Sequence, residues 1–157
     1  MTTNTPPYRA EHVGSLLRPV AVKEARRKFY EANSISAEEL KNVEDAAVTD
    51  VVKMQQNFGF QAVTDGELRR TFWHYDFIGA LDGFEMVERE ENQGLQFHGA
   101  NLRPIFPTIT GRVDFPDDHP MLDHFKYLAS VTKVTPKISI PGPSCCHFRV
   151  AKADIQP

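Results

Sequence analysis

The amino-acid sequence predicts an α/β fold, namely roughly the first half of a (β/α)8 TIM barrel, with parallel strands joined by crossover helices. The expected strands alternate with helical spans long enough to cross over, which favours a parallel sheet. Four expected strands also end in a polar or glycine-bearing motif, as the strands of such a barrel do at its ligand-binding face. These motifs are Gly14-Ser15, Asp65-Gly66-Glu67, Gly111-Arg112 and Gly142-Pro143-Ser144.

The length of the chain limits this prediction. A complete barrel typically needs about 250 residues, whereas the chain has 157. We therefore expect residues 8–157 to be the N-terminal half of a truncated barrel, after a disordered lead over residues 1–7.

Composition excludes several classes of protein. A hydrophobic content of 41% and a charged content of 25% are ordinary for a globular domain. The net charge of -3 argues against a nucleic-acid binder, and no apolar run approaches the roughly 20 residues of a membrane span. The N-terminus shows no secretion signal, so we expect a cytoplasmic protein. The two cysteines, Cys145 and Cys146, are adjacent and offer no disulfide framework.

The first half of the chain predicts a strand over 8–15 and then two helices. Pro19 suits the first turn of a helix over 20–30, and Ser36 with Glu39 forms a capping box for a longer helix that ends near Gly59. One apolar stripe along the longer helix is expected to face the core. Its members are Leu40, Val43, Ala47, Val51, Met54 and Phe58.

The second half predicts a short strand over 60–63, a partly helical aromatic stretch over 73–78 and an excursion or hairpin over 85–101. A strand over 107–115, a helix over 120–131 and a strand over 137–140 follow.

The stretch after Val63 contains several closely spaced charged residues that could bind a ligand. An apolar strand runs into Thr-Asp-Gly-Glu, where Gly66 permits a sharp turn and two carboxylates need partners. Parallel α/β folds place ligands at such strand ends. The alternative is a solvated loop in which Asp65 or Glu67 only caps the next helix. Gly14-Ser15 likewise suits a carboxylate cradle or an ordinary turn.

Three segments resemble the cobalamin-independent methionine synthase family, in particular its short single-barrel members. These members are often labelled 5-methyltetrahydropteroyltriglutamate–homocysteine methyltransferase-like. The first segment runs from His12 to Pro19. The second comprises Val63 to Arg70 with Trp73 to Phe77, and the third comprises Pro141 to Ser144 with His147 to Arg149. The resemblance covers nearly all of the chain from Tyr8 onward.

The resemblance implies a barrel in which zinc binds the homocysteine thiol and lowers its pKa, so that a thiolate attacks the methyl donor. The family's Ile-Gly-Ser turn and Gly-Glu glutamate bind the amino-acid group of homocysteine, and they fall on Val13, Gly14, Ser15 and Glu67 here. A folate-contacting arginine falls on Arg112. From the residues themselves, we expect Asp65 in the same pocket. Arg18 and Arg69 either orient anionic substrate groups or form supporting salt bridges, the latter being expected for Arg69.

The family's zinc ligands belong to the second half of the barrel. We therefore expect no catalytic residue and no metal ligand in this chain, Cys145 and Cys146 included. His12 and His147 either line the pocket or pack as hydrogen-bonded histidines. The tryptophan that methionine synthases carry after the Gly-Pro turn is not found after Gly142-Pro143, which leaves the methyl donor open.

The expected function is zinc-dependent methyl transfer from a 5-methyltetrahydrofolate-type donor to homocysteine in a full-length parent, with the chain alone inactive. The alternatives are a non-catalytic half-barrel that dimerises and a zinc-thiolate transferase acting on epoxides and coenzyme M. The expected partner is a small-molecule thiol, not nucleic acid or membrane. Self-association through open sheet edges is also expected.

Overall fold

A computed structural model describes residues 12–88 and 105–147. The predicted lead over 1–7, the start of the strand over 8–15 and the second part of the excursion over 85–101 lie outside these residues. The described residues form two compact units, one of residues 12–70 with 121–139 and one of residues 71–120 with 140–147.

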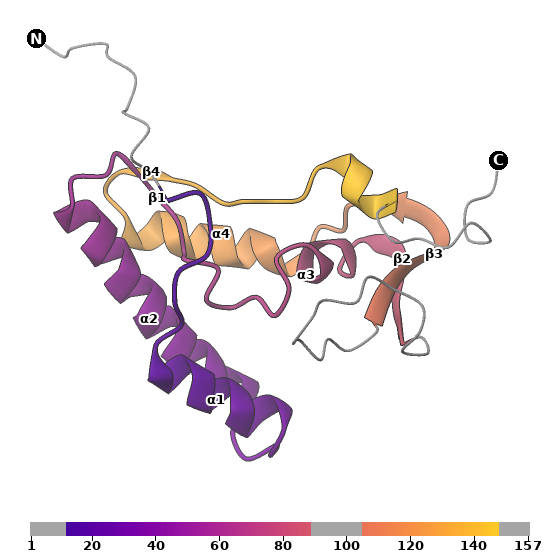
Figure 1. Ribbon diagram of the computed structural model, residues 1–157, viewed down its shortest axis with the longest axis horizontal. Helices are drawn as coiled ribbons and strands as arrows, with labels where there is room; N and C mark the ends of the chain where they lie inside the picture. Colours follow the sequence, from indigo (N-terminus) through magenta and orange to yellow (C-terminus); the bar gives the residue numbers. More distant parts are fainter. Residues whose placement is uncertain (1–11, 89–104, 148–157) are drawn as a thin grey trace, which may run out of the picture. The chain divides into compact units, whose positions relative to one another are not determined.

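The first unit contains two short parallel strands and three helices (Figure 1). Strand β1 (Ala62–Val63) pairs with β4 (Thr135–Pro136) in parallel register, with Ala62 opposite Thr135 and Val63 opposite Pro136. The pairing extends by hydrogen bonds from the Thr135 amide to the Gln61 carbonyl (3.1 Å) and from the Lys137 amide to the Val63 carbonyl (2.8 Å). The strand predicted over 137–140 therefore pairs slightly earlier in the chain. The described residues before Leu16 form no strand.

The helices begin and end where local signals predict. Helix α1 spans Val20–Tyr30 after Pro19, and α2 spans Ala37–Asn57. The Glu39 amide donates to Ser36 Oγ (3.1 Å) and the Ser36 amide donates to Glu39 Oε2 (2.7 Å), so the predicted capping box is present. Gly59 ends the helix with a φ of +82°, a conformation that glycine adopts without strain. Helix α4 (Pro120–Val131) matches the predicted range.

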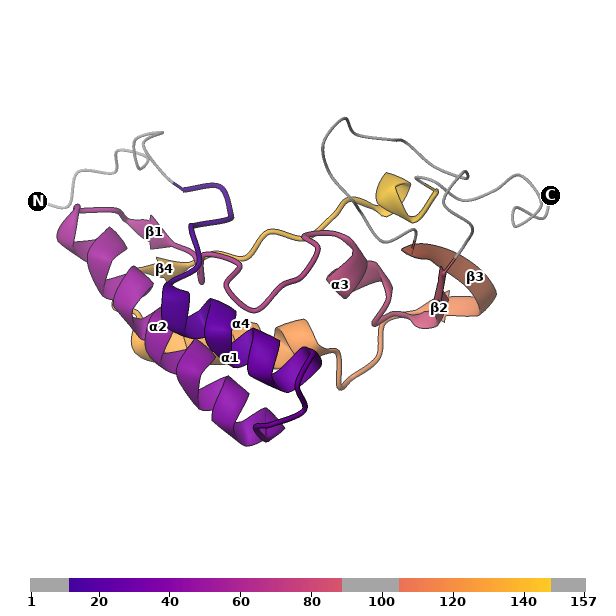
Figure 2. The ribbon, with the colours of Figure 1, turned by 60° about the horizontal axis from the view of Figure 1, so that its bottom comes forward.

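The core of the first unit lies between the three helices and β1. In Figure 2, α1, α2 and α4 lie on one side of the β1–β4 pair. The buried cluster combines side chains from each of these elements with one from the turn after β1. It consists of Val22, Ala47, Val48, Val52, Val63, Leu68 and Leu128.

The predicted apolar stripe of α2 is wrong at its C-terminal end. Met54 and Phe58 are exposed, whereas Glu44 and Gln55 are buried. The buried face follows 44, 48, 52 and 55, because the polar side chains at 44 and 55 find partners on neighbouring segments.

The second unit contains a hairpin and a short helix, α3 (Tyr75–Ile78). Strand β2 (Asp82–Glu88) pairs with β3 (Ile105–Asp114) in antiparallel register, with a bulge between Asp82 and Phe84. The strand predicted over 107–115 therefore exists but pairs with the expected excursion and not with the parallel strands. An alternating pattern predicts a strand without naming its neighbour. A 3-10 turn, η1, covers Pro143–His147.

The fold class is thus α/β, with a parallel strand pair and covering helices. The half-barrel remains a prediction. No helix in the described part of the chain is long and apolar enough to cross a membrane.

Candidate functional site

The stretch after β1 forms a sharp turn with two consecutive residues in the left-handed region. Gly66 has a φ of +66° and Glu67 a φ of +54°. Glutamate adopts this conformation at a cost of about 1 to 2 kcal/mol, so its surroundings must hold it. Asp65 Oδ1 accepts a hydrogen bond from the Glu67 amide (2.9 Å), and Thr64 Oγ1 accepts one from the Gly66 amide (3.2 Å). Asp65 therefore shapes this turn, and no helix begins here.

The turn lies directly against the first predicted motif. A Cβ atom built on Gly14 would lie 2.5 Å from Glu67 Oε1. The Leu16 amide donates to the Gly66 carbonyl (2.9 Å), and Thr64 Oγ1 donates to the Gly14 carbonyl (3.3 Å). Gly14 and Glu67, 53 positions apart in the sequence, are therefore neighbours, and exposed Ser15 lies between Gly14 and the bonded Leu16.

Ser139, which the sequence did not single out, connects a third segment to this site. Its hydroxyl donates to the Val13 carbonyl (2.6 Å), and its carbonyl accepts a hydrogen bond from Arg70 Nη2 (2.5 Å). The same hydroxyl oxygen lies 3.7 Å from a Cβ built on Gly14. Segments following β1 and β4 thus meet the His12–Pro19 segment, as the carboxyl ends of parallel strands do.

Glu67 itself is buried, with its carboxylate near one cation. Its side chain is 11% exposed, and Arg70 Nη1 lies 3.6 Å from Glu67 Oε1. This distance is that of an ion pair and longer than a hydrogen bond. A carboxylate with two acceptor oxygens has capacity for further donors.

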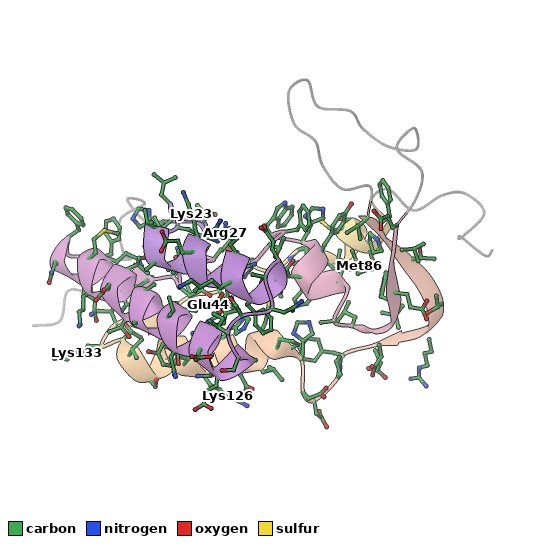
Figure 3. The ribbon with its side chains drawn as sticks, turned by 90° about the horizontal axis from the view of Figure 1, so that it is seen from below. Lys23, Arg27, Glu44, Met86, Lys126 and Lys133 are labelled. Carbon is green, nitrogen blue, oxygen red and sulfur yellow. The ribbon has the colours of Figure 1, made fainter. Side chains whose placement is uncertain are left out.

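Arg69 points into a buried ionic network, as the salt-bridge interpretation of this residue predicts. Its guanidinium lies 2.5 Å from Asp45 Oδ1 and 3.6 Å from Glu44 Oε2. Arg26 completes the network at 2.9 Å from Glu44 Oε1, and Glu44 sits on the side of α2 that faces α1 (Figure 3). Burial raises the pKa of Glu44 despite the two arginines. Burial also opposes ionisation of Asp45, but hydrogen bonds from Lys41 and Arg69 hold the pKa of Asp45 below its ordinary value.

His124 on α4 adds a titratable group beside the turn. Burial, together with the positive charges of Arg69 and Arg70 and against the opposing effect of Asp65 and Asp123, lowers its pKa from 6.5 to about 4. The ring is therefore neutral at pH 7.

Gln55 on α2 anchors the beginning of the turn. Its amide oxygen accepts from the Thr64 amide (3.0 Å), and its amide nitrogen donates to the carbonyls of Thr64 (2.8 Å) and Val51 (3.0 Å). The side chain is fully buried and replaces a strand partner for Thr64. A buried glutamine on a helix face leaves no periodic signal, so the sequence did not reveal it.

The remaining predicted residues have varied surroundings. Val13 is 81% exposed, and Arg18 donates to the carbonyls of the turn. Arg112 is exposed on β3, in the second unit, so its contact with folate stays a prediction. The His12 ring packs edge-on against Phe60 with centroids 5.0 Å apart, and the side chain of His147 lies outside the described residues.

A metal site does not emerge from the described residues. Among residues 12–88 and 105–147, no three His, Cys, Asp or Glu side chains gather closely enough to hold an ion. Burial raises the pKa of the Cys146 thiol, and the neighbouring Cys145 raises it further, which disfavours the thiolate that zinc requires.

An apolar groove of about 540 Å³ lies on the first unit, between the start of α1 and α2. Pro19, Val43, Ala46, Val51 and Met54 contribute to its lining. Exposed apolar surface of this kind suits a protein contact, but self-association stays a prediction.

Comparisons with known proteins bear on the fold and on the relatives of the chain. No protein-family model matches the chain. The uncharacterized protein YxjH of Bacillus subtilis is 43% identical over 143 residues, which are 90% of this chain and 37% of YxjH. Methionine synthase of Sulfolobus acidocaldarius is 29% identical over 133 residues, which are 83% of this chain and 37% of that protein. A crystal structure from Listeria monocytogenes, described as that of a "putative vitamin-B12 independent methionine synthase", has a TM-score of 0.72 at 34% identity. The matched region covers 92% of this chain and 39% of the chain from Listeria monocytogenes.

Fold and turn together define a class, an α/β protein with a candidate site at the carboxyl end of a parallel strand. Within that class, the chain is similar over most of its own length to proteins of the cobalamin-independent methionine synthase family. The relatives named methionine synthase indicate methyl transfer at the level of the family. The chain spans 37% of the length of the first curated relatives it matches, so the activity of the whole protein is a proposal.

Proposed function

We propose that the chain supplies the acceptor-binding part of a cobalamin-independent methyltransferase, and that its turn binds the amino-acid group of a thiol such as homocysteine. The observation that carries this proposal is the contact between Gly14 and the Glu67 carboxylate. Glu67 pairs with the substrate ammonium, while Ser15 and the amides of its turn receive the substrate carboxylate. Asp65 keeps Glu67 in position through the hydrogen bond to its amide.

The strained backbone of Glu67 supports this assignment. A left-handed conformation at a residue other than glycine persists only where surrounding contacts determine it, and such residues cluster at binding sites. Asparagine or glycine at position 67 would form the same turn with less strain. The carboxylate is therefore the feature that a purely structural turn does not need.

Zinc and a 5-methyltetrahydrofolate-type donor belong to the proposal only for the full-length parent. The donor atoms of the described residues do not fit a tetrahedral zinc site, since Cys145 and Cys146 are adjacent in the chain and no three candidate ligands converge. We therefore assign acceptor binding, and no step of thiol activation, to the described residues.

The experiment is a kinetic comparison of the full-length parent with its Glu67→Ala variant, supplied with zinc, homocysteine and 5-methyltetrahydrofolate. Loss of the ammonium partner is expected to raise the KM for the thiol about tenfold or more. The proposal would be contradicted if Glu67→Ala had the same KM for homocysteine as the parent. Glu85→Ala, an exposed glutamate on β2, is the matched control.

A further inference from the structure

Five consecutive carbonyl groups, from Gly66 to Arg70, all accept hydrogen bonds from the segment that spans residues 16–26. The Gly66 carbonyl accepts from the Leu16 amide. The Glu67 carbonyl accepts from Arg18 Nη2 (3.2 Å), and the Leu68 carbonyl accepts from Arg18 Nε (3.0 Å). The Arg69 carbonyl accepts from Arg26 Nη1 (2.7 Å), and the Arg70 carbonyl accepts from Arg18 Nη2.

Arg18 contributes three of these bonds from one planar group. A guanidinium presents its N–H groups in a fixed fork, so three bonds to separate carbonyls fix the relative position of residues 67, 68 and 70. These carbonyls belong to Glu67 itself and to two residues that follow it in the same turn. A lysine ammonium at position 18 keeps the charge but does not reproduce the fork.

We propose that Arg18 is a positioning residue, whose guanidinium holds the 67–70 turn so that the Glu67 carboxylate stays beside Gly14. The sequence suggested direct contact between Arg18 and an anionic group of the substrate. The geometry favours an indirect role, because Nε and Nη2 are engaged by the turn. This inference rests on the proposed function for its effect on ligand binding, but its effect on the turn does not depend on any ligand.

The first test measures amide hydrogen exchange in the wild-type chain and in Arg18→Gln, without ligand. The Leu16 and Arg70 amides, which bond the Gly66 and Glu67 carbonyls, are expected to exchange about tenfold faster or more in the variant. Amides in the middle of α2 should keep their rates. Arg27→Gln is the matched control, since Arg27 is an exposed arginine on α1 (Figure 3). Unchanged exchange at Leu16 and Arg70 in Arg18→Gln would overturn the proposal.

The second test measures the affinity for L-methionine by isothermal titration calorimetry. Arg18→Gln and Arg18→Lys are both expected to bind L-methionine with an affinity about tenfold lower than that of the wild type, or lower still. Arg27→Gln should bind as the wild type does. A merely structural role would lower the melting temperature and leave the affinity at 25 °C unchanged, which would overturn the positioning role. Failure of the wild-type chain to bind methionine would refute the proposed function, and the exchange experiment would still decide the role of Arg18.

Discussion

The Glu67 carboxylate occupies the space that a side chain at position 14 would enter. A Cβ atom at position 14 would lie 2.5 Å from Glu67 Oε1 and 3.2 Å from Glu67 Cδ. A larger residue at position 14 would therefore displace the carboxylate of a residue 53 positions away. The contact links two motifs that the sequence could only place on separate strand ends.

Gly14→Ala tests this contact. The added methyl group meets the end of a flexible side chain, which can swing aside, so the free energy of unfolding should fall by no more than about 1 kcal/mol. Because its Glu67 carboxylate is displaced, the Gly14→Ala variant should bind L-methionine with an affinity about tenfold lower than that of the wild type, or lower still. Urea unfolding and calorimetric titration measure the two effects. Gly111→Ala is the control, because its Cβ would meet only Gly83 at an ordinary 3.8 Å. Unweakened binding by Gly14→Ala would contradict the role of the contact.

Removal of Arg69 tests the buried network. Arg69→Ala leaves Glu44 and Asp45 with fewer partners in a buried position, so we expect the free energy of unfolding to fall by about 3 to 5 kcal/mol. The exposed pair Lys53–Asp50, at 3.9 Å, provides the control. Lys53→Ala should change stability by at most about 1 kcal/mol. Equal losses in the two variants would show that the network does not stabilise the fold.

Gln55→Leu tests the anchor of the turn. The substitution keeps an apolar side chain of similar size but leaves the buried backbone groups of Thr64 without their partner. A loss of roughly 2 to 3 kcal/mol in unfolding free energy is expected, with faster amide exchange at Thr64. Gln61→Leu, on an exposed side chain, should show neither effect. A stable Gln55→Leu with a protected Thr64 amide would refute this account.

The depressed pKa of His124 predicts a specific dependence of stability on pH. The unfolded chain takes up a proton near pH 6.5, whereas folded His124 takes one up only near pH 4. Stability is therefore lost as the pH falls from about 6.5 to about 4, by at most about 3 kcal/mol, and the loss stops below that window.

The measurement is urea unfolding of the wild type and of His124→Gln between pH 7 and pH 4. The difference between the two chains isolates His124 from the carboxylates that titrate in the same range. That difference should change across the window and be constant above pH 7. A difference independent of pH would show that the folded and unfolded states protonate His124 alike.

Local signals predicted much of the first unit. The capping box at Ser36 and Glu39 and the glycine at position 59 act within a few residues, so α2 begins and ends where the sequence indicates. The parallel pairing of β1 was also predicted from strand ends and crossover spans.

Features that depend on distant partners could not be predicted from the sequence. Glu44 is buried because Arg26 and Arg69 pair with it. Gln55 is buried because it bonds the backbone of Thr64. The hydrophobic periodicity of α2 carries no information about these distant partners. The partner of β3 depends on the bulged hairpin with β2, and alternation in β3 alone does not specify it. Ser139 and Arg18 act at the site through backbone carbonyl groups, which leave no trace in residue type.

The preference of the chain for an amino acid over its deaminated analogue tests the central claim most directly. Titrations compare L-methionine with 4-(methylthio)butanoate, which lacks only the ammonium group, against wild type and Glu67→Gln. The account predicts that the wild type prefers methionine by about tenfold or more and that Glu67→Gln loses this preference while keeping its fold. Equal binding of both ligands by the wild type, or an undiminished preference in Glu67→Gln, would contradict it.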